Sequence, residues 1–259
     1  MYEILKEIAK EAGPLLRDGY GKSKSITFKS AIDLVTQYDL QIELFLKEKL
    51  GIAFPEHTLV GEETSEAIAY PEKAIYIDPI DGTTNFVHGI PFCAISIGIW
   101  EEGRAVAGVV YNPILEELFY AEAGKGATMN GRALHVTDTD TLQNSLIATG
   151  FPYTKVEEGE DFRWVMETME SVLPCTRDVR RLGSAAIDLC YVARGTFDGY
   201  YEINLKPWDV SAGLLILLEA GGKITQEEGK AYALDERIIV ATNGKIHEAL
   251  IAKTGKRKI

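Results

Sequence analysis

The spacing of apolar and polar residues changes character along the chain. In residues 1–20 apolar side chains recur at helical spacing with charges between them, which predicts an amphipathic helix that Pro14 kinks or ends. Residues 38–50 repeat this pattern, which stops at Gly51. Four apolar runs follow and predict strands at 74–78, 93–100, 105–111 and 117–121. Turn residues separate these runs, so we expect an antiparallel meander.

The second half of the chain alternates between strand and helix patterns. Short apolar runs predict strands at 145–149, 176–179, 199–202, 223–225 and 238–241. Longer stretches between them predict helices near 161–172, 184–194, 208–220 and 245–253. This alternation is typical of an α/β layer arrangement. The polar stretch 137–144 marks a soft boundary, so we predict an α+β subdomain at 1–140 and an α/β subdomain at 141–259, packed as one body around a cleft.

Composition restricts the kinds of partner. The chain has 259 residues, of which 46% are hydrophobic and 25% charged, as in an ordinary soluble globular protein. Its net charge of −12 argues against a nucleic-acid surface, which normally has a basic face. The same charge would repel an anionic substrate unless bound cations reverse the local field.

Cysteine use and the chain start predict the compartment. Cys93, Cys175 and Cys190 are odd in number and far apart, which predicts buried thiols in a reducing environment. The first residues are charged, unlike a signal peptide, and the longest apolar run, 214–218, is too short to span a bilayer. We therefore expect a cytoplasmic protein without a membrane partner.

The stretch 77–84, Ile-Asp-Pro-Ile-Asp-Gly-Thr-Thr, carries the strongest chemical signal. Asp78 and Asp81 lie at the end of a predicted strand, and Pro79 interrupts its hydrogen-bond ladder. Gly82 lets the backbone come close to a bound group. Carboxylate oxygens at a strand end suit Mg²⁺, and backbone amides suit a phosphate if a helix opens at Gly82 and Thr83. Metal and phosphate at one turn indicate phosphoryl chemistry.

Further acids accompany this motif, and each has an ordinary interpretation when taken alone. Glu62 and Glu63 follow a short apolar run, and such a pair is usually a solvated loop. Asp209 opens a predicted helix, where an aspartate is usually a cap. The motif itself could be a simple turn. Only their combination in this order indicates a metal site.

That combination resembles the inositol monophosphatase family of Mg²⁺-dependent, lithium-sensitive sugar-phosphate phosphatases. The matching segments are 33–39, 61–63, 77–89, 183–186, 208–209 and 219–222. The Asp-Pro-Ile-Asp-Gly-Thr core is shared with fructose bisphosphatases and phosphoadenosine phosphatases, whereas the continuation at 84–89 is similar to the inositol branch. The resemblance implies a layered αβαβα sandwich, as in sugar phosphatases, and a homodimer.

The resemblance also implies roles for individual residues. The ligands of two or three Mg²⁺ ions would be Glu62, Asp78, the carbonyl of Ile80, Asp81 and Asp209. Thr83 and Glu62 would orient a metal-activated water and accept its proton, with Asp39 polarising the Thr83 hydroxyl. Lys29 matches a basic residue near a third metal, or is an ordinary surface lysine.

Substrate contacts follow from the same resemblance. They would come from Glu62, Ile80, Asp81, Gly82, Thr83, Gly183, Ser184, Ala185, Glu202 and Asp209. Glu202 matches an acid that accepts hydrogen bonds from the hydroxyls of the substrate ring. Ser184 could also cap a helix, and Arg180 and Arg181 could reach a phosphate, a second subunit or a neighbouring acid.

Two classes of function fit these residues. The first is hydrolysis of inositol monophosphate, with fructose-1,6-bisphosphatase or a dual-specificity sugar phosphatase as the alternative, and with phosphoadenosine phosphate and histidinol phosphate as further substrates. Glu202 favours a polyol over a nucleotide, since a carboxylate would repel a second phosphate. The second class is a regulatory protein that docks on the transcription machinery with vestigial or parallel phosphatase activity and no direct nucleic-acid contact.

Overall fold

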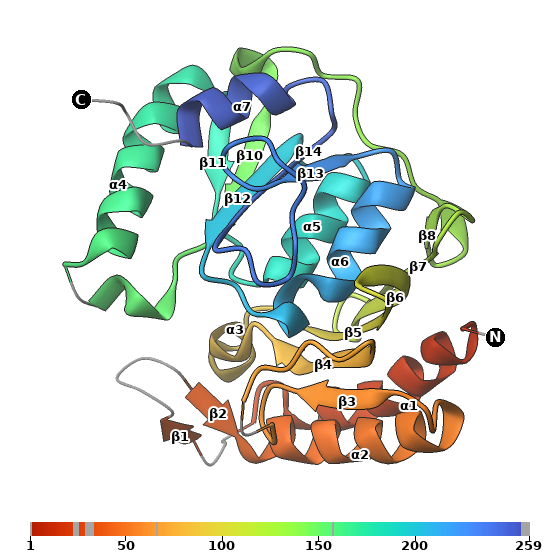
Figure 1. Ribbon diagram of the computed structural model, residues 1–259. Coiled ribbons are helices and arrows are strands. Elements are labelled where there is room, and N and C mark those ends of the chain that lie inside the picture. The colour runs from red at the N-terminus through yellow and green to blue at the C-terminus, as the bar shows by residue number, and fades with distance from the viewer. Residues whose placement is uncertain (1, 23–25, 29–33, 66, 157, 255–259) are drawn as a thin grey trace.

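The fold has five layers of helix and sheet. The computed structural model describes residues 2–22, 26–28, 34–65, 67–156 and 158–254. A helix pair, a seven-stranded sheet, a second helix pair, a five-stranded sheet and a third helix pair follow one another through the molecule (Figure 1). The predicted αβαβα sandwich is therefore confirmed.

The first layer consists of α1 (Ile4–Gly19) and α2 (Gln37–Ala53). Pro14 lies inside α1, which continues for another turn, so the helix does not end there. At the start of α2 the side chain of Thr36 accepts a hydrogen bond from the Tyr38 amide, and Asp39 accepts one from the Thr36 amide. This reciprocal cap fixes where α2 begins and how Asp39 is oriented.

The seven-stranded sheet covers these helices. Its strands, in spatial order, are β3 (Thr58–Gly61), β4 (Lys73–Asp81), β5 (Ala94–Glu101), β6 (Arg104–Asn112), β7 (Glu117–Glu122), β8 (Ala127–Met129) and β9 (Arg132–Ala133). The predicted antiparallel meander is confirmed from β4 to β7. The pairing of β3 parallel to β4 and a separate antiparallel hairpin of β1 (Ile26–Phe28) and β2 (Leu34–Thr36) were not predicted.

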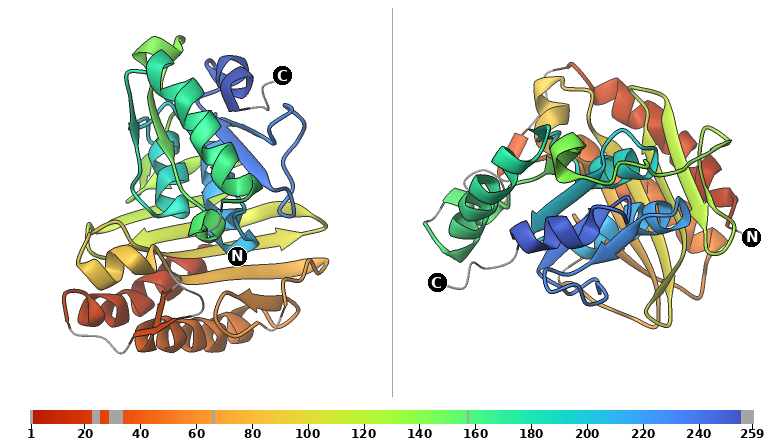
Figure 2. Two further views of the ribbon diagram at one scale, coloured as in Figure 1. Left: turned by 90° about the vertical axis from the view of Figure 1, so that its left-hand side faces the viewer. Right: turned by 90° about the horizontal axis from the view of Figure 1, so that it is seen from above.

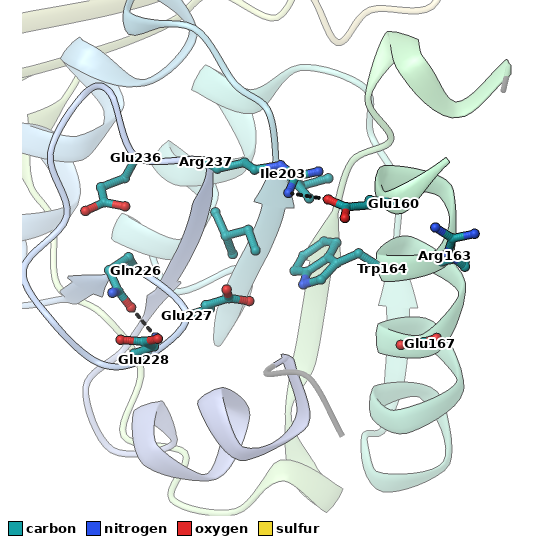
Figure 3. Close-up of a pocket in the computed structure, with 11 residues that line it drawn as sticks. Glu160, Arg163, Trp164, Glu167, Ile203, Gln226, Glu227, Glu228, Glu236 and Arg237 are labelled. Carbon is teal, nitrogen blue, oxygen red and sulfur yellow. Dashed lines mark hydrogen bonds and ion pairs between the residues drawn. The ribbon is translucent and has the colours of Figure 1, made fainter. Parts of the chain in front are cut away.

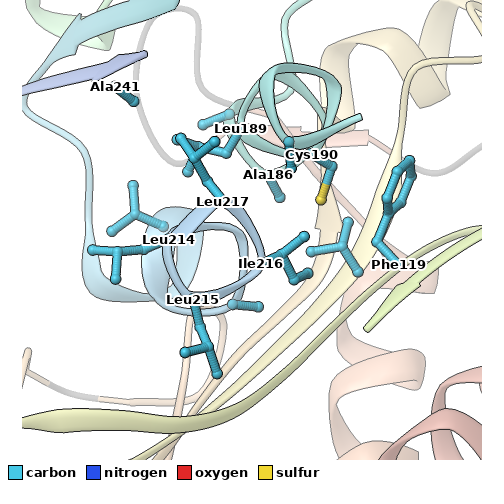
Figure 4. Close-up of a cluster of buried hydrophobic side chains, with 14 of the residues drawn as sticks. Phe119, Ala186, Leu189, Cys190, Leu214, Leu215, Ile216, Leu217 and Ala241 are labelled. Carbon is cyan, nitrogen blue, oxygen red and sulfur yellow. The ribbon is translucent and has the colours of Figure 1, made fainter. Parts of the chain in front are cut away.

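The central layer is the apolar pair α5 (Ala185–Ala193) and α6 (Pro207–Glu219). Every residue of α5 is buried, since the helix has protein on all sides. Leu189 and Cys190 of α5 face Leu214, Ile216 and other side chains of α6 (Figure 4). This core cluster takes residues from both 1–140 and 141–259, and the division at residue 140 stays a prediction.

The second sheet is mixed. Its strands, in spatial order, are β11 (Asp178–Arg180), β10 (Leu146–Thr149), β12 (Gly199–Ile203), β14 (Ile238–Thr242) and β13 (Lys223–Thr225). β10 runs parallel to β11 and β12, whereas β14 runs antiparallel to β12 and β13. Outside it lie α4 (Glu160–Val172) and α7 (His247–Thr254) (Figure 2).

Short elements complete the described chain. They are α3 (Thr83–His88) and the 3₁₀ turns Leu142–Asn144, Tyr153–Val156 and Leu173–Cys175. The thiols of Cys93 and Cys190 are buried as expected, but Cys175 is only half-buried. None of the helices in the described residues has the length and apolar character needed to cross a membrane.

Candidate functional site

The end of β4 carries two aspartates on an irregular piece of strand. Asp78 pairs opposite Ser96 and Asp81 opposite Ala94, so one extra residue lies on the β4 side. Such a bulge redirects side chains locally. The Asp78 carboxylate accepts a hydrogen bond from the Ile80 amide at 3.0 Å, which closes a small turn around the intervening proline. The strand therefore does not stop at Pro79 but shifts its register there.

Gly82 makes the connection from β4 to α3 possible. Its φ is +90°, and a Cβ atom there would lie 2.7 Å from the Phe92 carbonyl oxygen and 3.1 Å from that of Gly183. A side chain would therefore force these backbones apart. As the sequence predicts, a helix opens at Thr83, but it has only six residues. A phosphate here would depend on individual amides more than on a helix dipole.

Thr83 joins this turn to α2. Its hydroxyl can donate to Asp39 Oδ1 at 3.1 Å or to the Ile80 carbonyl at 3.0 Å. Asp39 is 1% exposed and also accepts from the Thr36 hydroxyl at 2.6 Å. Burial raises the pKa of the Asp39 carboxyl, although its hydrogen bonds oppose the shift. The predicted pairing of Asp39 with Thr83 is thus present in the structure.

Asp81 is held from the other half of the chain. Its Oδ2 accepts hydrogen bonds from the Ser184 hydroxyl at 2.6 Å and from the Ala186 amide at 2.7 Å. Ser184 also accepts from the Ile187 amide at 3.3 Å, which confirms it as the cap of α5, while its contact with a substrate stays a prediction. Asn85 of α3 adds a second link by donating to the Leu182 carbonyl at 2.8 Å.

Asp209 and Glu62 approach from two further elements. Asp209 lies in the first turn of α6, where it accepts a hydrogen bond from the Lys206 amide at 2.6 Å, so it also serves as a helix cap. Glu62 follows β3, and its amide extends the parallel ladder by donating to the Ile77 carbonyl at 3.1 Å. Glu62, Asp78, Asp81 and Asp209 line one cavity of about 230 Å³.

These four carboxylates are electrostatically unfavourable together. Burial, followed by the charges of the neighbouring acids, raises the pKa of Asp78 and Asp209 well above the ordinary range. Burial likewise raises the pKa of Asp81 to about 6 against its hydrogen bonds. A divalent cation would remove this conflict, because it favours the charged form of each oxygen ligand.

The shape of the site also fits magnesium. Within the described ranges no group of three or more His, Cys, Asp or Glu side chains is arranged so that it could hold a metal ion by itself, and the four acids at β4 line a cavity. Mg²⁺ keeps several waters and needs only a few protein ligands, so an open arrangement of oxygen donors suits it better than it would suit zinc.

A second cavity of about 500 Å³ continues from the first. Both are lined by Asp81, Gly82, Thr83, Glu202 and Asp209, and the larger one adds Gly183, Ser184 and Ala185. The structure therefore brings the residues expected to contact the substrate around one connected space. Lys29, the remaining candidate, lies outside the described residues.

Glu202 is fixed at the wall of this space. It lies on β12, is 8% exposed, and accepts a hydrogen bond from the Tyr200 hydroxyl at 2.5 Å. Burial raises its pKa to about 7. A Cβ atom on Gly150 would lie 1.9 Å from Glu202 Oε2, so only glycine leaves room for the carboxylate. The sequence analysis missed both Tyr200 and Gly150.

The two neighbouring arginines have different surroundings. Arg180 pairs with Asp178 at 2.5 Å, as an acid partner. Arg181 lines the larger cavity with Lys155, and its guanidinium lies 5.5 Å from the centre of the Phe151 ring. Arg181 is therefore within the same space as Glu202, whose pKa its charge lowers against the larger effect of burial.

Two other buried acids were missed. Glu43 of α2 is completely buried and accepts hydrogen bonds from the turn that follows β3. Asp188 of α5 is 1% exposed, and neither of its carboxylate oxygens has a hydrogen-bond partner within the described structure. Burial raises the pKa of Asp188 well above the ordinary range. For Asp188 the available signal was a charge inside an otherwise apolar helix pattern.

A separate acid-rich cavity of about 480 Å³ lies between α4 and the segment before β14 (Figure 3). Its lining includes Glu160, Glu167, Glu228 and Glu236, all exposed, together with Arg237. Arg237 pairs with Glu160 at 3.3 Å, and Glu228 pairs with Lys230 at 2.6 Å. Basic groups pair with two of these acids, whereas Glu227 in the same lining is half-buried and its Oε2 has no hydrogen-bond partner among the described residues.

Comparisons with known proteins found similarity along nearly the whole chain. The model of the inositol monophosphatase family matches residues 1–258. The chain is 41% identical over 258 residues to inositol monophosphatase 2 of Solanum lycopersicum, with 96% of each chain covered. It is 39% identical over 257 residues to Nus factor SuhB of Pasteurella multocida, covering 98% of this chain and 95% of that protein. The crystal structure of the extragenic suppressor protein suhB from Bartonella henselae matches with a TM-score of 0.89 and 38% identity, covering 98% of this chain and 97% of the other.

Proposed function

Since the chain belongs to the inositol monophosphatase family, we propose that it is a Mg²⁺-dependent phosphomonoesterase that hydrolyses inositol monophosphate. The observation that carries this proposal is the burial of Asp78 and Asp81, whose pKa values are raised, beside the Gly82–Thr83 turn in one cavity. Acids placed in this way hold cations, and the adjacent amides accommodate a phosphate.

The residues that would hold Mg²⁺ are Glu62, Asp78, the Ile80 carbonyl, Asp81 and Asp209. When bound, Mg²⁺ supplies Lewis-acid chemistry that lowers the pKa of water and neutralises charge on the phosphoryl oxygens. The backbone amides of Gly82 and Thr83 would hold the phosphate. Hydrolysis then breaks the phosphorus–oxygen bond to the alcohol by in-line attack of water.

Thr83 and Asp39 would accept the proton of the attacking water. The Thr83 hydroxyl can give its hydrogen to Asp39, which leaves an oxygen lone pair to accept a proton from the attacking water. Burial raises the pKa of Asp39 and makes it a better proton acceptor than an exposed aspartate. Glu62, which lines the same cavity, would orient the same water.

Glu202 would select the alcohol part of the substrate. Its carboxylate is fixed by Tyr200 and lines both connected cavities. A fixed carboxylate accepts hydrogen bonds from vicinal hydroxyls, which suits a polyol ring. It would repel a second phosphate unless Lys155 or Arg181 offsets its charge.

The test is phosphate release by the purified chain from inositol-1-phosphate, fructose-1,6-bisphosphate and phosphoadenosine phosphate, each with Mg²⁺ and with EDTA. We expect Mg²⁺-dependent release that is fastest with inositol-1-phosphate. Faster release from fructose-1,6-bisphosphate would identify a dual-specificity sugar phosphatase instead. No release from any of the three would overturn the enzymatic proposal.

A regulatory role is the second candidate. It is favoured by the Nus factor SuhB of Pasteurella multocida, which is nearly as similar to this chain as the tomato inositol monophosphatase is. We would measure binding of the purified chain to the transcription elongation machinery, with the Asp81→Asn variant alongside. Equal binding by both proteins would separate a docking role from hydrolysis, and absence of binding would remove this candidate.

A further inference from the structure

Helix α2 presents two acids, one turn apart, to two different turns of the site. Asp39 and Glu43 are four residues apart and therefore lie on the same face of the helix. Asp39 faces the Thr83 turn, as described above. Glu43 faces residues 61–65, the turn that carries Glu62.

The contacts of Glu43 are unusually complete for a buried acid. Its Oε2 accepts a hydrogen bond from the Glu63 amide at 2.7 Å. Its Oε1 accepts from the Thr64 amide at 3.0 Å and from the Thr64 hydroxyl at 2.5 Å, and Lys47 lies 3.2 Å away. The side chain is fully buried, so these bonds replace the water that the carboxylate has lost.

The turn is packed against this carboxylate. A Cβ atom on Gly61 would lie 2.3 Å from Glu43 Oε1, so glycine is required for the approach. The Gly61 amide donates to the Ser65 hydroxyl at 3.0 Å, and the Glu62 amide donates to the Ile77 carbonyl. The backbone is therefore held on both sides of Glu62, and Glu43 supplies the contacts on the C-terminal side.

We propose that Glu43 is a positioning residue that places Glu62 for cation binding and thereby sets the affinity of the site for Mg²⁺. This inference rests on the proposed role of Glu62 as a metal ligand, but not on any particular substrate. Partners that orient metal ligands typically change metal affinity about 10–100-fold when they are removed. Asp39, by contrast, acts on the Thr83 hydroxyl, so its loss affects turnover more than cation binding.

The decisive experiment measures Mn²⁺ binding to the purified full chain by electron paramagnetic resonance, without substrate. Glu43→Gln keeps the size of the side chain but replaces one acceptor oxygen by an amide that faces a donor. We expect it to weaken Mn²⁺ binding about tenfold. Glu48→Gln, on the exposed side of the same helix, is the matched control and should bind Mn²⁺ like the unaltered chain.

Kinetics provide an independent readout. In Glu43→Gln the Mg²⁺ concentration for half-maximal phosphate release should rise about tenfold, with kcat largely recovered at saturating Mg²⁺. Asp39→Asn should show the opposite pattern. Its kcat should be lower, and the Mg²⁺ concentration for half-maximal phosphate release should change less. Unchanged Mn²⁺ binding in a folded Glu43→Gln protein would overturn the proposal.

A second variant guards against misfolding of the first. Thr64→Val leaves Glu43 and the core of α2 intact and removes the hydroxyl of an exposed residue, which donates to Glu43 and accepts from Lys47. It should weaken Mn²⁺ binding about two- to threefold. If Glu43→Gln does not fold, unchanged Mn²⁺ binding by Thr64→Val would overturn the proposal.

The enzymatic function and the role of Glu43 can fail separately. Weakened Mn²⁺ binding by the variants of a chain that hydrolyses none of the phosphate esters would refute the enzymatic function but retain the role of Glu43. Failure of the unaltered chain to bind Mn²⁺ would remove both.

Discussion

The described residues form one acid-rich cavity at the end of β4 and another beside α4, and the two differ in how deeply their acids are buried. At the end of β4 the carboxylates of Asp78 and Asp81 are buried, and their pKa values are raised. In the cavity beside α4 four of the five lining glutamates are exposed, Arg163 and Arg237 share the lining, and the hydrogen bond from Lys230 lowers the pKa of Glu228. The number of acids is similar, so their density does not distinguish the two places.

Burial without counter-charge makes the difference. An exposed acid keeps its water and gains little from a nearby lysine or arginine. A buried acid that lacks a basic partner destabilises the fold unless it is protonated or bound to a cation. The buried acids at the end of β4 therefore have the capacity to bind a cation. The contrast between this cavity and the one beside α4 can be tested directly.

The largest effect is expected from Asp81→Asn. This change removes a proposed metal ligand, so phosphate release should fall by more than about 100-fold, beyond the usual loss from an outer partner. The fold should persist, since Ser184 and Ala186 can still donate to the remaining carbonyl oxygen. The control in the other cavity is Glu160→Gln, which should keep full activity. Normal turnover in the Asp81 variant would refute the assignment.

Gly150→Ala should produce the next largest effect. The added Cβ would lie 1.9 Å from the Glu202 carboxylate and must displace it. We expect KM for the phosphate ester to rise roughly 10-fold, less than the ~10²-fold cost of misplacing a catalytic group by 1 Å. Gly51→Ala is a suitable control, because its nearest neighbour would be Leu59 Cδ1 at 3.8 Å. An unchanged KM would show that Glu202 does not contact the substrate.

The two cavities should also respond to pH with opposite signs. The folded-state pKa of Asp81, about 6, lies above its unfolded value. Its contribution to stability is therefore complete below the unfolded pKa and is lost as pH rises through about 6. The difference from the ordinary pKa corresponds to ~3 kcal/mol.

Thermal unfolding in EDTA is the corresponding measurement. Tm should fall by roughly 3–6 °C between about pH 5 and pH 8, and excess Mg²⁺ should restore it at the higher pH. Glu228, with its lowered pKa, contributes in the reverse sense, because its small stabilisation is lost as pH falls. A Tm that is independent of pH and of Mg²⁺ would remove the distinction between the cavities.

The smallest effect is expected from Asp188→Asn. Burial raises the pKa of this acid in the folded state, so its ionisation after unfolding favours the unfolded chain at neutral pH and above. Removing the titration should raise Tm by roughly 2–4 °C at about pH 8 and by less near pH 5. A larger gain at acidic pH would contradict the sign of this pKa shift.

Local sequence signals predicted the parts of the site that lie within single elements. The turn at 78–83 follows from an aspartate, a proline and a glycine in fixed order, and Asp209 follows from its place at a helix start. The meander and the alternating second half follow from apolar periodicity. Each of these depends on residues close together in the sequence.

Contacts between distant elements could not be obtained in that way. The role of Glu43 appears only when α2 crosses beneath the turn after β3, and that of Gly150 only when β10 pairs with β12. Pro14 illustrates a different limit, since packing of α1 against α2 and β6 outweighs the local cost of the proline. Lys29 and the proposed subdomain boundary stay predictions.

The spread of the carboxylates along the chain has a consequence for how the protein is made. Glu62 and Asp209 line one cavity, although most of the sequence separates them. A ribosome must therefore release α6 before all four acids can meet, and contacts of such long range form late in folding. Mg²⁺ can bind at all four acids only when the chain has folded through residue 209. Its binding therefore stabilises folded chains that include α6 over chains truncated before it.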